Sequence, residues 1–307
     1  MIYASAAELI GNTPLMRADR FAKTYGIDAN LVVKLESRNP GGSSKDRIAL
    51  NMICRAEERG ELKPGATLIE ATSGNTGVGL GVVAAARGYR VVLTMPESMS
   101  LERRKILEAL GVSIVLTDAQ RGMAGANERA EELLNEIPGS RRMLQFDNPD
   151  NPLAHEATTG PEIWRDSEGR VDALIAGVGT GGTVCGAGRY LKKQNPEVRV
   201  IAVQPAESPV LTGGQANAHG IQGLGANFVP KNYDPSVVDE VISIKTEDAV
   251  EAAKLFMKTE GILSGISCGA ALAGARVYAQ KRGKQGETIV VILPDTGERY
   301  LSTALFD

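Results

Sequence analysis

Short apolar segments alternate along most of this chain with longer segments that repeat apolar residues at helical spacing. Strands are predicted at 31–35, 67–71, 90–95, 113–116, 143–146, 173–176, 198–203, 238–244 and 288–293. Helices are predicted at 45–60, 78–87, 101–110, 122–135, 161–166, 184–194, 246–260 and in an alanine-rich segment ending near 282. Strands that alternate with helices favour parallel sheets covered by helices on both faces. The predicted fold class is therefore α/β.

Two of these strands end in a polar, glycine-containing loop that opens the next helix. The loop at 177–183 has the sequence GVGTGGT. Its glycines let the backbone approach an anion, and the positive end of a helix dipole lies at the same point, so it predicts a phosphate site. The loop at 72–77, TSGNTG, offers hydroxyl and N–H groups that suit a carboxylate or another small anion. Both loops follow the carboxyl ends of strands, where α/β sheets bind ligands.

The first loop also matches the dinucleotide-binding pattern G-x-G-x-x-G through Gly177, Gly179 and Gly182. That pattern needs an acidic residue at the end of the next strand, roughly 20 residues on. The next strand ends in glutamine and proline, and Glu207 comes only after them, which disfavours a dinucleotide. A glycine-rich turn without a ligand is the other alternative for this loop.

A lysine lies in the first turn of the helix predicted at 45–60. Ser43 or Ser44 suits the N-cap position, which places Lys45 just inside the helix. The positive end of the helix dipole repels a charged lysine there and favours the neutral amine, which acts as a nucleophile towards an aldehyde or as a base. Alternatively, Lys45 is an exposed lysine balanced by Asp46.

Composition narrows the classes of partner. With 307 residues, 43% of them hydrophobic and 23% charged, the chain has the composition of a globular protein of one or two closely packed domains. A net charge of -3 gives no reason to expect a nucleic-acid partner, which would need a concentrated basic surface. No apolar stretch approaches the length of a membrane span and the first residues lack a signal-peptide pattern, so we expect a cytoplasmic protein without a membrane partner.

Cysteine and histidine usage argues against a metal site. Cys54, Cys185 and Cys268 are far apart, in a spacing that suits neither zinc nor a disulfide framework. Only His155 and His219 are available, so a histidine-rich metal site or a histidine-based triad is poorly supported. We expect no metal, and proton chemistry that uses another residue type.

A cofactor and its substrate together account for the phosphate loop, the second anion loop and the lysine. Pyridoxal 5'-phosphate bound to Lys45 as a Schiff base satisfies the first and third, and an amino-acid substrate satisfies the second. The motifs involved are SKDR at 44–47, TSGNTG at 72–77, GTGGT at 179–183 and GIS at 265–267. Together with IGNTPL at 10–15 and GERYLST at 297–303, they resemble the β-replacement family of pyridoxal-phosphate enzymes over nearly the whole chain, and within it the cysteine synthases (O-acetylserine sulfhydrylases).

The resemblance implies an architecture. It is the fold type II, or tryptophan synthase β-like, arrangement of two parallel-rich sheet domains with helices on both faces. A smaller N-terminal α/β domain would span 40–150, and a larger α/β domain with the phosphate loop would span 1–39 and 151–307, the active site lying between them. A homodimer is implied by the resemblance alone, as is a possible partner, the C-terminal tail of serine acetyltransferase.

The resemblance also assigns roles to residues. Lys45 is the implied catalytic residue, Asn75 lies beside the phenolic oxygen of the cofactor, and Ser267 is the partner of its pyridine nitrogen. The implied cofactor contacts are Lys45, Asn75, Gly179, Thr180, Gly181, Gly182, Thr183 and Ser267. The implied substrate contacts are Thr72, Ser73, Asn75, Thr76, Gln145 and Gly223.

The implied reaction converts O-acetyl-L-serine and sulfide into L-cysteine and acetate through an aminoacrylate. A neutral serine opposite the ring nitrogen makes the ring a weaker electron sink than a carboxylate would, which favours β-elimination over transamination. Cystathionine β-synthase carries similar loops, but IQGLG at 221–225 and MSLERR at 99–104 look more like the cysteine synthases. A sulfhydrylase that prefers O-phosphoserine or thiosulfate, and a non-catalytic subunit that senses amino acids, are further alternatives.

Two residues depart from the family pattern. Ser44 replaces the valine common before the lysine, and Cys268 replaces a common second serine. Neither change removes an implied cofactor contact. We expect Cys268 to be structural, with a redox role as the alternative.

Overall fold

The computed structural model describes residues 2–307, apart from the side chain of Glu102, and the chain forms two compact units. The first unit comprises the described residues up to Ile10 together with Asn39–Asn151. The second comprises Gly11–Arg38 together with Pro152–Asp307. Each unit has its own sheet with helices packed on it, which confirms the predicted α/β class.

The predicted domain bounds stay a prediction, and the compact units differ from them at the start of the chain. Residues 1–39 are predicted in the larger domain, whereas the described residues up to Ile10 belong to the first unit. The reason is that η1 (Ala6–Leu9) packs against α3 (Asn75–Arg87) of that unit. A single short turn carries no sequence pattern that would reveal such a contact.

The second unit is built on a six-stranded sheet in the order β1-β2-β10-β7-β8-β9. Only the β1 and β2 pair is antiparallel. The strands are β1 (Leu15–Arg17), β2 (Asn30–Leu35), β7 (Ala173–Gly177), β8 (Arg199–Pro205), β9 (Glu240–Ile244) and β10 (Thr288–Leu293). The helices include α1 (Asp19–Tyr25), α7 (Gly160–Asp166), α8 (Gly182–Gln194), α9 (Thr246–Glu260) and α10 (Ile266–Arg282).

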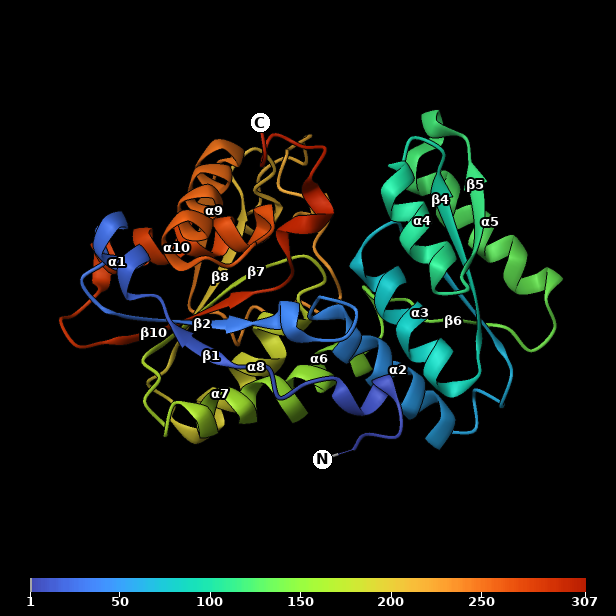
Figure 1. Ribbon diagram of the computed structural model, residues 1–307, viewed down its shortest axis with the longest axis horizontal. Helices are drawn as coiled ribbons and strands as arrows, with labels where there is room; N and C mark the ends of the chain where they lie inside the picture. Colours follow the sequence, from blue (N-terminus) through green and yellow to red (C-terminus); the bar gives the residue numbers. More distant parts are fainter. Residues whose placement is uncertain (1) are drawn as a thin grey trace. The chain divides into compact units, whose positions relative to one another are not determined.

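Alternate residues of the central strands of this sheet point to opposite faces. Ile175 of β7 and Ile201 of β8 belong to the core beneath α9 and α10. Leu174 and Val200 belong to the core beneath α7 and α8. Figure 1 shows these two pairs of helices on opposite sides of the sheet. Because both faces are buried, the strands are continuous apolar runs in the sequence rather than alternating ones.

The first unit is built on a four-stranded parallel sheet in the order β5-β4-β3-β6. Its strands are β3 (Thr67–Ala71), β4 (Arg90–Pro96), β5 (Ser113–Thr117) and β6 (Arg141–Arg142). Besides α3, its helices include α2 (Lys45–Glu58), α4 (Leu101–Ala109) and α5 (Gly122–Glu136). α5 covers the face that carries Ile69 and Ala71, whereas α3 lies against Leu93 and packs on α2 (Figure 1).

The strand predicted at 143–146 is wrong. The strand at this edge of the sheet is β6, Arg141–Arg142, and the chain leaves the extended conformation at Leu144, whose φ is 54°. The backbone N–H groups of Leu144 and Gln145 donate to the carboxylate of Glu70. The apolar composition predicted a strand here. The Glu70 side chain, and not a neighbouring strand, accepts the hydrogen bonds of these two backbone N–H groups.

Two helices begin earlier than predicted, because their loops form the first turn. α3 begins at Asn75 rather than at 78, and α8 begins at Gly182 rather than at 184. Short segments escaped prediction because each is too brief to show a period: β1, α1, and α6 (Asp150–Ala154) with the π-helix His155–Thr159 that continues it.

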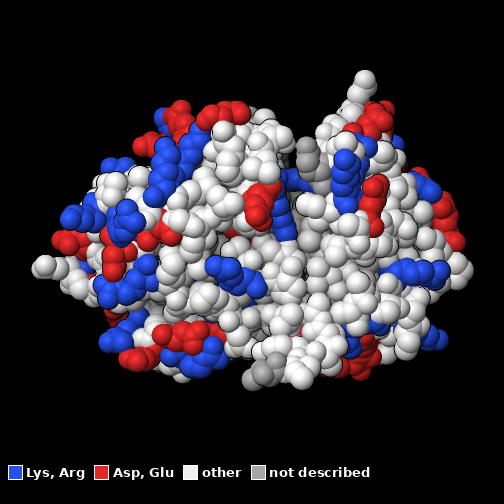
Figure 2. Space-filling view, viewed as in Figure 1, with Lys and Arg blue, Asp and Glu red and all other residues white. Residues whose placement is uncertain are grey.

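Charges of both signs are interspersed on the face of the molecule shown in Figure 2. Many charged side chains form exposed ion pairs within one unit, for example Arg129 with Glu132 and Glu136. Such pairs contribute little to stability because water screens them. Across residues 2–307, no helix is both long enough and apolar enough to cross a membrane.

Candidate active site

Lys45 is the first residue of α2, as the sequence predicts. Its backbone N–H donates to Ser43 Oγ at 3.2 Å, and its Nζ lies 3.4 Å from Ser44 Oγ. The next residue, Asp46, is buried and accepts a hydrogen bond from the Gly41 N–H at 2.5 Å. These contacts tie the preceding loop to the first turn of α2 and hold the backbone at Lys45 in place. Lys45 itself is half-buried.

α3 approaches α2 directly at this lysine. A Cβ at Gly79 would lie 2.8 Å from the carbonyl oxygen of Lys45 and 2.9 Å from its carbonyl carbon. Neither atom can move aside without shifting the backbone of α2, so the close approach requires glycine at position 79. The helix that opens with the 72–77 loop is therefore packed against the residue expected to bind the cofactor.

The predicted carboxylate site gathers at the start of α3. Thr72 Oγ1 accepts a hydrogen bond from the Gly74 N–H at 3.2 Å, which shapes the loop. Thr76 donates to Gln145 Oε1 at 2.6 Å, and both residues are buried. Ser73 and Asn75 are half-buried in the same loop. The structure thus brings Gln145 to the loop across a long stretch of sequence.

Glu70 is a residue that sequence reasoning missed. It lies in β3, is 3% exposed, and accepts hydrogen bonds from the N–H groups of Leu144 at 2.8 Å and Gln145 at 3.4 Å. Burial raises the pKa of Glu70, and the backbone N–H groups and the charge of Arg142 partly offset this rise. A carboxylate at this position holds Leu144 in its left-handed conformation and so positions Gln145. Its signal in the sequence is one acidic residue inside the apolar segment TLIEA.

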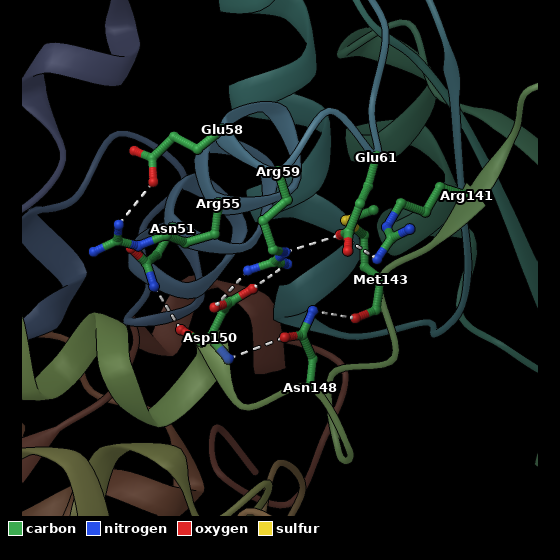
Figure 3. A network of polar contacts seen from close by, with 9 residues as sticks. All are labelled: Asn51, Arg55, Glu58, Arg59, Glu61, Arg141, Met143, Asn148 and Asp150. Carbon is green, nitrogen blue, oxygen red and sulfur yellow. Dashed lines mark hydrogen bonds and ion pairs between the residues drawn. The ribbon is translucent and has the colours of Figure 1, made fainter.

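A polar network anchors the segment around Gln145 on both sides (Figure 3). Arg59, just after α2, donates to both carboxylate oxygens of Asp150, at 3.2 and 2.7 Å. Asn148 accepts from the Asp150 N–H at 3.0 Å and donates to the carbonyl oxygen of Met143 at 3.0 Å. The network thereby connects the end of α2 to residues before and after Gln145.

The glycine loop of the second unit forms a cradle at the start of α8. Gly181 has φ +83°, in the left-handed region that favours glycine, and Gly182 begins the helix. The first N–H groups of a helix lack partners within it, and its dipole is positive at this end. The hydroxyls of Thr180 and Thr183 belong to the same turn. This donor set fits a phosphate group.

Gly223 and Ser267 lie next to this cradle. A Cβ at Gly179 would collide with the carbonyl oxygen of Gly223, and a Cβ at Gly223 would lie 3.7 Å from Ser267 Oγ. The φ at position 223 is +93°, a backbone conformation that favours glycine. Ser267 is buried in the first turn of α10. Three segments that are far apart in the sequence therefore meet within the second unit.

Cys268 lies beside Ser267 but faces the backbone. Its Sγ donates to the carbonyl oxygen of Asp295 at 3.4 Å, and burial raises its pKa well above the ordinary value of a thiol. The hydroxyl of Tyr300 donates to Asp295 Oδ2 at 2.5 Å. Asp295 thus links the start of α10 to the turn after β10.

The structure brings the predicted residues together in two groups. The first unit holds Lys45, Thr72, Ser73, Asn75, Thr76 and Gln145, and the second holds Gly179, Thr180, Gly181, Gly182, Thr183, Gly223 and Ser267. Among residues 2–307, no group of three or more histidine, cysteine, aspartate or glutamate side chains is placed to hold a metal ion.

Known proteins resemble this chain over its whole length. Residues 6–295 match the family model for "Pyridoxal-phosphate dependent enzyme". Cysteine synthase A of Escherichia coli (strain K12) is 51% identical over 314 residues, which cover 99% of this chain and 96% of that one. The solved cysteine synthase (OASS) of Entamoeba histolytica is 44% identical with a TM-score of 0.96, covering 100% of this chain and 91% of that one. A solved O-ureido-L-serine synthase is 44% identical with a TM-score of 0.95, and the match covers 100% of this chain and 96% of that one.

Proposed function

Because this chain belongs to the family of pyridoxal-phosphate dependent enzymes, we propose that it makes L-cysteine and acetate from O-acetyl-L-serine and sulfide. The bond between Cβ and the ester oxygen breaks, acetate leaves with the electron pair, and sulfide forms the new bond to Cβ. The proton removed from Cα is returned to it, so the reaction needs no oxidant or reductant.

The observation that supports this proposal most directly is the packing of α3 on α2. It places Gly79, two residues after the 72–77 loop, against the backbone of Lys45 at the start of α2. A lysine amine beside an anion site can act on an amino acid whose carboxylate that site binds. The cradle with Thr180 and Thr183 supplies the phosphate site that the cofactor requires.

Each group has a distinct task in this proposal. When bound, pyridoxal phosphate withdraws electrons from the amino acid and so makes its Cα proton acidic enough to remove. Lys45 Nζ holds the cofactor before substrate binds, then takes the Cα proton and later returns it. Thr72, Ser73, Thr76 and Gln145 bind the substrate carboxylate and orient Cα towards that amine. Asn75 binds the phenolic oxygen of the cofactor, and Gly223 lines the substrate side.

Ser267 explains why elimination is favoured. A hydroxyl can hydrogen-bond the ring nitrogen but brings no negative charge to keep it protonated. Ser267 would therefore leave the ring nitrogen of a bound cofactor without a charged partner, and the ring would withdraw electrons less strongly than it would beside a carboxylate. Departure of the leaving group from Cβ relieves the charge on Cα at once, so β-replacement is favoured over transamination.

The visible absorption spectrum of the purified protein is the first test. We expect a yellow band from protein-bound pyridoxal phosphate that changes when O-acetyl-L-serine is added and returns when sulfide follows. A band that ignores O-acetyl-L-serine but responds to serine and homocysteine would instead support a cystathionine β-synthase. A colourless protein that cannot be reconstituted would contradict the proposal and favour an amino-acid-sensing subunit.

Replacing Lys45 by alanine tests the role of the amine. We expect Lys45→Ala to lose at least about 100-fold in cysteine formation, because general acid–base catalysis alone supplies that much. Production of cysteine from O-acetyl-L-serine and sulfide is the measurement. Lys63→Ala, at an exposed lysine of the same unit, is the matched control and should keep full activity. A fully active Lys45→Ala protein would refute the assignment.

We propose a cytoplasmic homodimer whose active site also accepts the C-terminal tail of serine acetyltransferase. The resemblance to the cysteine synthases supports the homodimer and the binding of the tail. Light scattering would give the mass, and an acetyltransferase tail peptide should compete with O-acetyl-L-serine. A monomer, or a peptide without effect on the apparent KM, would contradict the respective part.

A further inference from the structure

His155 is a buried residue that the proposed reaction does not use. It is 1% exposed, and its ring lies between two threonine hydroxyls. Nδ1 is 2.9 Å from Thr159 Oγ1, and Nε2 is 3.1 Å from Thr183 Oγ1. Thr183 belongs to the glycine cradle at the start of α8, so the imidazole contacts the cradle from within the protein.

The backbone around His155 is built to place this ring. His155–Thr159 is a π-helix, a form that occurs mostly as single turns and often at functional sites. A Cβ at Gly186 of α8 would lie 2.9 Å from His155 Cβ, so the glycine lets the two segments pack closely. Glu156 accepts hydrogen bonds from Arg189 at 3.0 Å and Lys193 at 2.6 Å, both on α8. The π-helix is thereby held along α8 beside the cradle.

The hydrogen-bond chain has two possible directions. A neutral imidazole has one donor and one acceptor nitrogen, whereas each hydroxyl can donate once and also accept. If Nε2 accepts from Thr183, the hydroxyl proton points away from the cradle. If Nε2 donates to Thr183, Thr159 donates to Nδ1, and the proton of Thr183 is free to point towards an anion in the cradle. Only the second direction gives the anion another donor.

We propose that His155 is a positioning residue that donates from Nε2 to Thr183 and so directs the Thr183 hydroxyl proton at the cofactor phosphate. The proposal rests on the proposed function in one respect, that the cradle binds the phosphate of pyridoxal phosphate. A hydrogen bond donated to a charged group is stronger than one between neutral groups. His155 therefore raises the affinity for the phosphate without touching it.

The first test separates phosphate binding from binding of the rest of the cofactor. Apoprotein would be titrated with pyridoxal 5'-phosphate and with pyridoxal, which lacks the phosphate, and the ratio of the two dissociation constants measured. Two variants are matched in chemistry. In His155→Gln an amide nitrogen can reach the position of Nε2, whereas in His155→Asn it can reach only that of Nδ1.

We expect His155→Asn to lower the preference for the phosphorylated compound by about 10-fold to 100-fold, the effect of losing a hydrogen bond to a charged group. His155→Gln should retain most of the preference. The dissociation constant of pyridoxal should be the same in all three proteins. An unchanged ratio in His155→Asn, or an equal loss in both variants, would overturn the proposal.

A second test reads the tautomer in the unaltered protein. The chain has only two histidines, so a sample labelled with ¹⁵N in histidine shows two imidazoles, and His219→Asn assigns them. We expect His155 to carry its proton on Nε2 when pyridoxal phosphate is bound. A proton on Nδ1 alone would overturn the proposal, even if the His155 variants failed to fold.

These results distinguish the two ideas. If the protein binds pyridoxal phosphate through Lys45 but shows neither the ratio change nor the Nε2 proton, the function stands and the role of His155 falls. The proposed function itself fails under two joint observations. The wild type would form no yellow band, and its preference for pyridoxal phosphate over pyridoxal would be no larger than that of His155→Asn.

Discussion

At the scale of single residues, the first unit depends on a buried carboxylate. Glu70 lies among apolar residues of β3 and is compensated by backbone N–H groups rather than by a buried cation in direct contact. Its oxygens replace the strand partners that Leu144 and Gln145 would otherwise need. A side chain in one strand thus determines the conformation of a segment more than seventy residues later.

The raised pKa of Glu70 predicts a pH effect on stability. Its unfolded-state pKa is about 4.3, so the folded protein holds the proton to higher pH than the unfolded chain. The stabilisation from this group is complete below about pH 4.3 and is lost as pH rises through the folded pKa. The total loss is about 1.4 kcal/mol for each pH unit that separates the folded pKa from the unfolded one. Glu70→Gln cannot titrate, so its unfolding free energy should rise relative to that of the wild type as pH increases over this range.

Urea unfolding of both proteins between about pH 4 and 7 is the measurement, with the difference in unfolding free energy as the quantity compared. Using the difference cancels the titration of all other groups. A difference that stays constant, or that moves in favour of the wild type as pH rises, would contradict the assigned pKa direction.

The three cysteines should differ in reactivity. Burial raises the pKa of Cys185 to about 11 and that of Cys268 well above its usual value, and both side chains are inaccessible. Cys54 is half-buried, and although burial raises its pKa too, reagent can reach it. Because the thiolate is the nucleophile, we expect one thiol, Cys54, to react in the native protein at about pH 8.

Labelling with a disulfide reagent followed by peptide mass spectrometry checks this. Cys54→Ala should abolish the native-state reaction, whereas unfolding should expose the other two thiols. Labelling of Cys268 as fast as Cys54 would show that it is not the structural cysteine expected from the sequence.

At the scale of elements, glycines decide how closely helices pack. α3 contains Gly77, Gly79 and Gly81, all buried, which is costly for an isolated helix. Close packing in the folded protein offsets this cost, because a Cβ at each glycine would meet a neighbour. The neighbours are Leu93, the backbone of Lys45, and Val112 respectively. Only the Gly79 neighbour is backbone, so that position tolerates change least.

We expect Gly79→Ala to lower the unfolding free energy by about 1–3 kcal/mol, the usual range for overpacking, despite the better helix propensity of alanine. It should also weaken cofactor binding, because the clash lies at Lys45. Ala85→Gly, at an exposed position of the same helix, measures the effect of helix propensity alone, about 1 kcal/mol. A Gly79→Ala protein more stable than the wild type would refute the close contact.

At the scale of the whole molecule, cofactor binding should be visible as stability. A ligand that binds only the folded state adds about 2.7 kcal/mol at 100 times its Kd. For units of this size that corresponds to a rise in Tm of roughly 5–10 °C. Calorimetry of the protein with and without pyridoxal phosphate is the measurement.

Lys45→Ala is the control for this experiment. It keeps the phosphate cradle but lacks the amine, so its Tm should rise less than that of the wild type at the same cofactor concentration. A Tm that does not respond to pyridoxal phosphate in the wild type would contradict a specific site.

The sequence by itself determined the α/β class, nearly all strands and helices, and the loops that form the candidate site. These features depend on local patterns: apolar runs, helical spacing, and glycines at strand-to-helix turns. Lys45 at a helix start and GTGGT at the start of α8 were readable for the same reason. Motifs shared with a known family then supplied their roles.

Only the tertiary structure decided how distant side chains support those motifs. Glu70 holding Gln145, Gly79 against Lys45, and His155 behind Thr183 all join residues far apart in the chain or on different elements. No local pattern encodes such contacts, because each depends on how sheets and helices pack once formed. A single glutamate in a strand, or a single histidine, is compatible with many roles. The residues that pack against it in the folded protein determine which role it has.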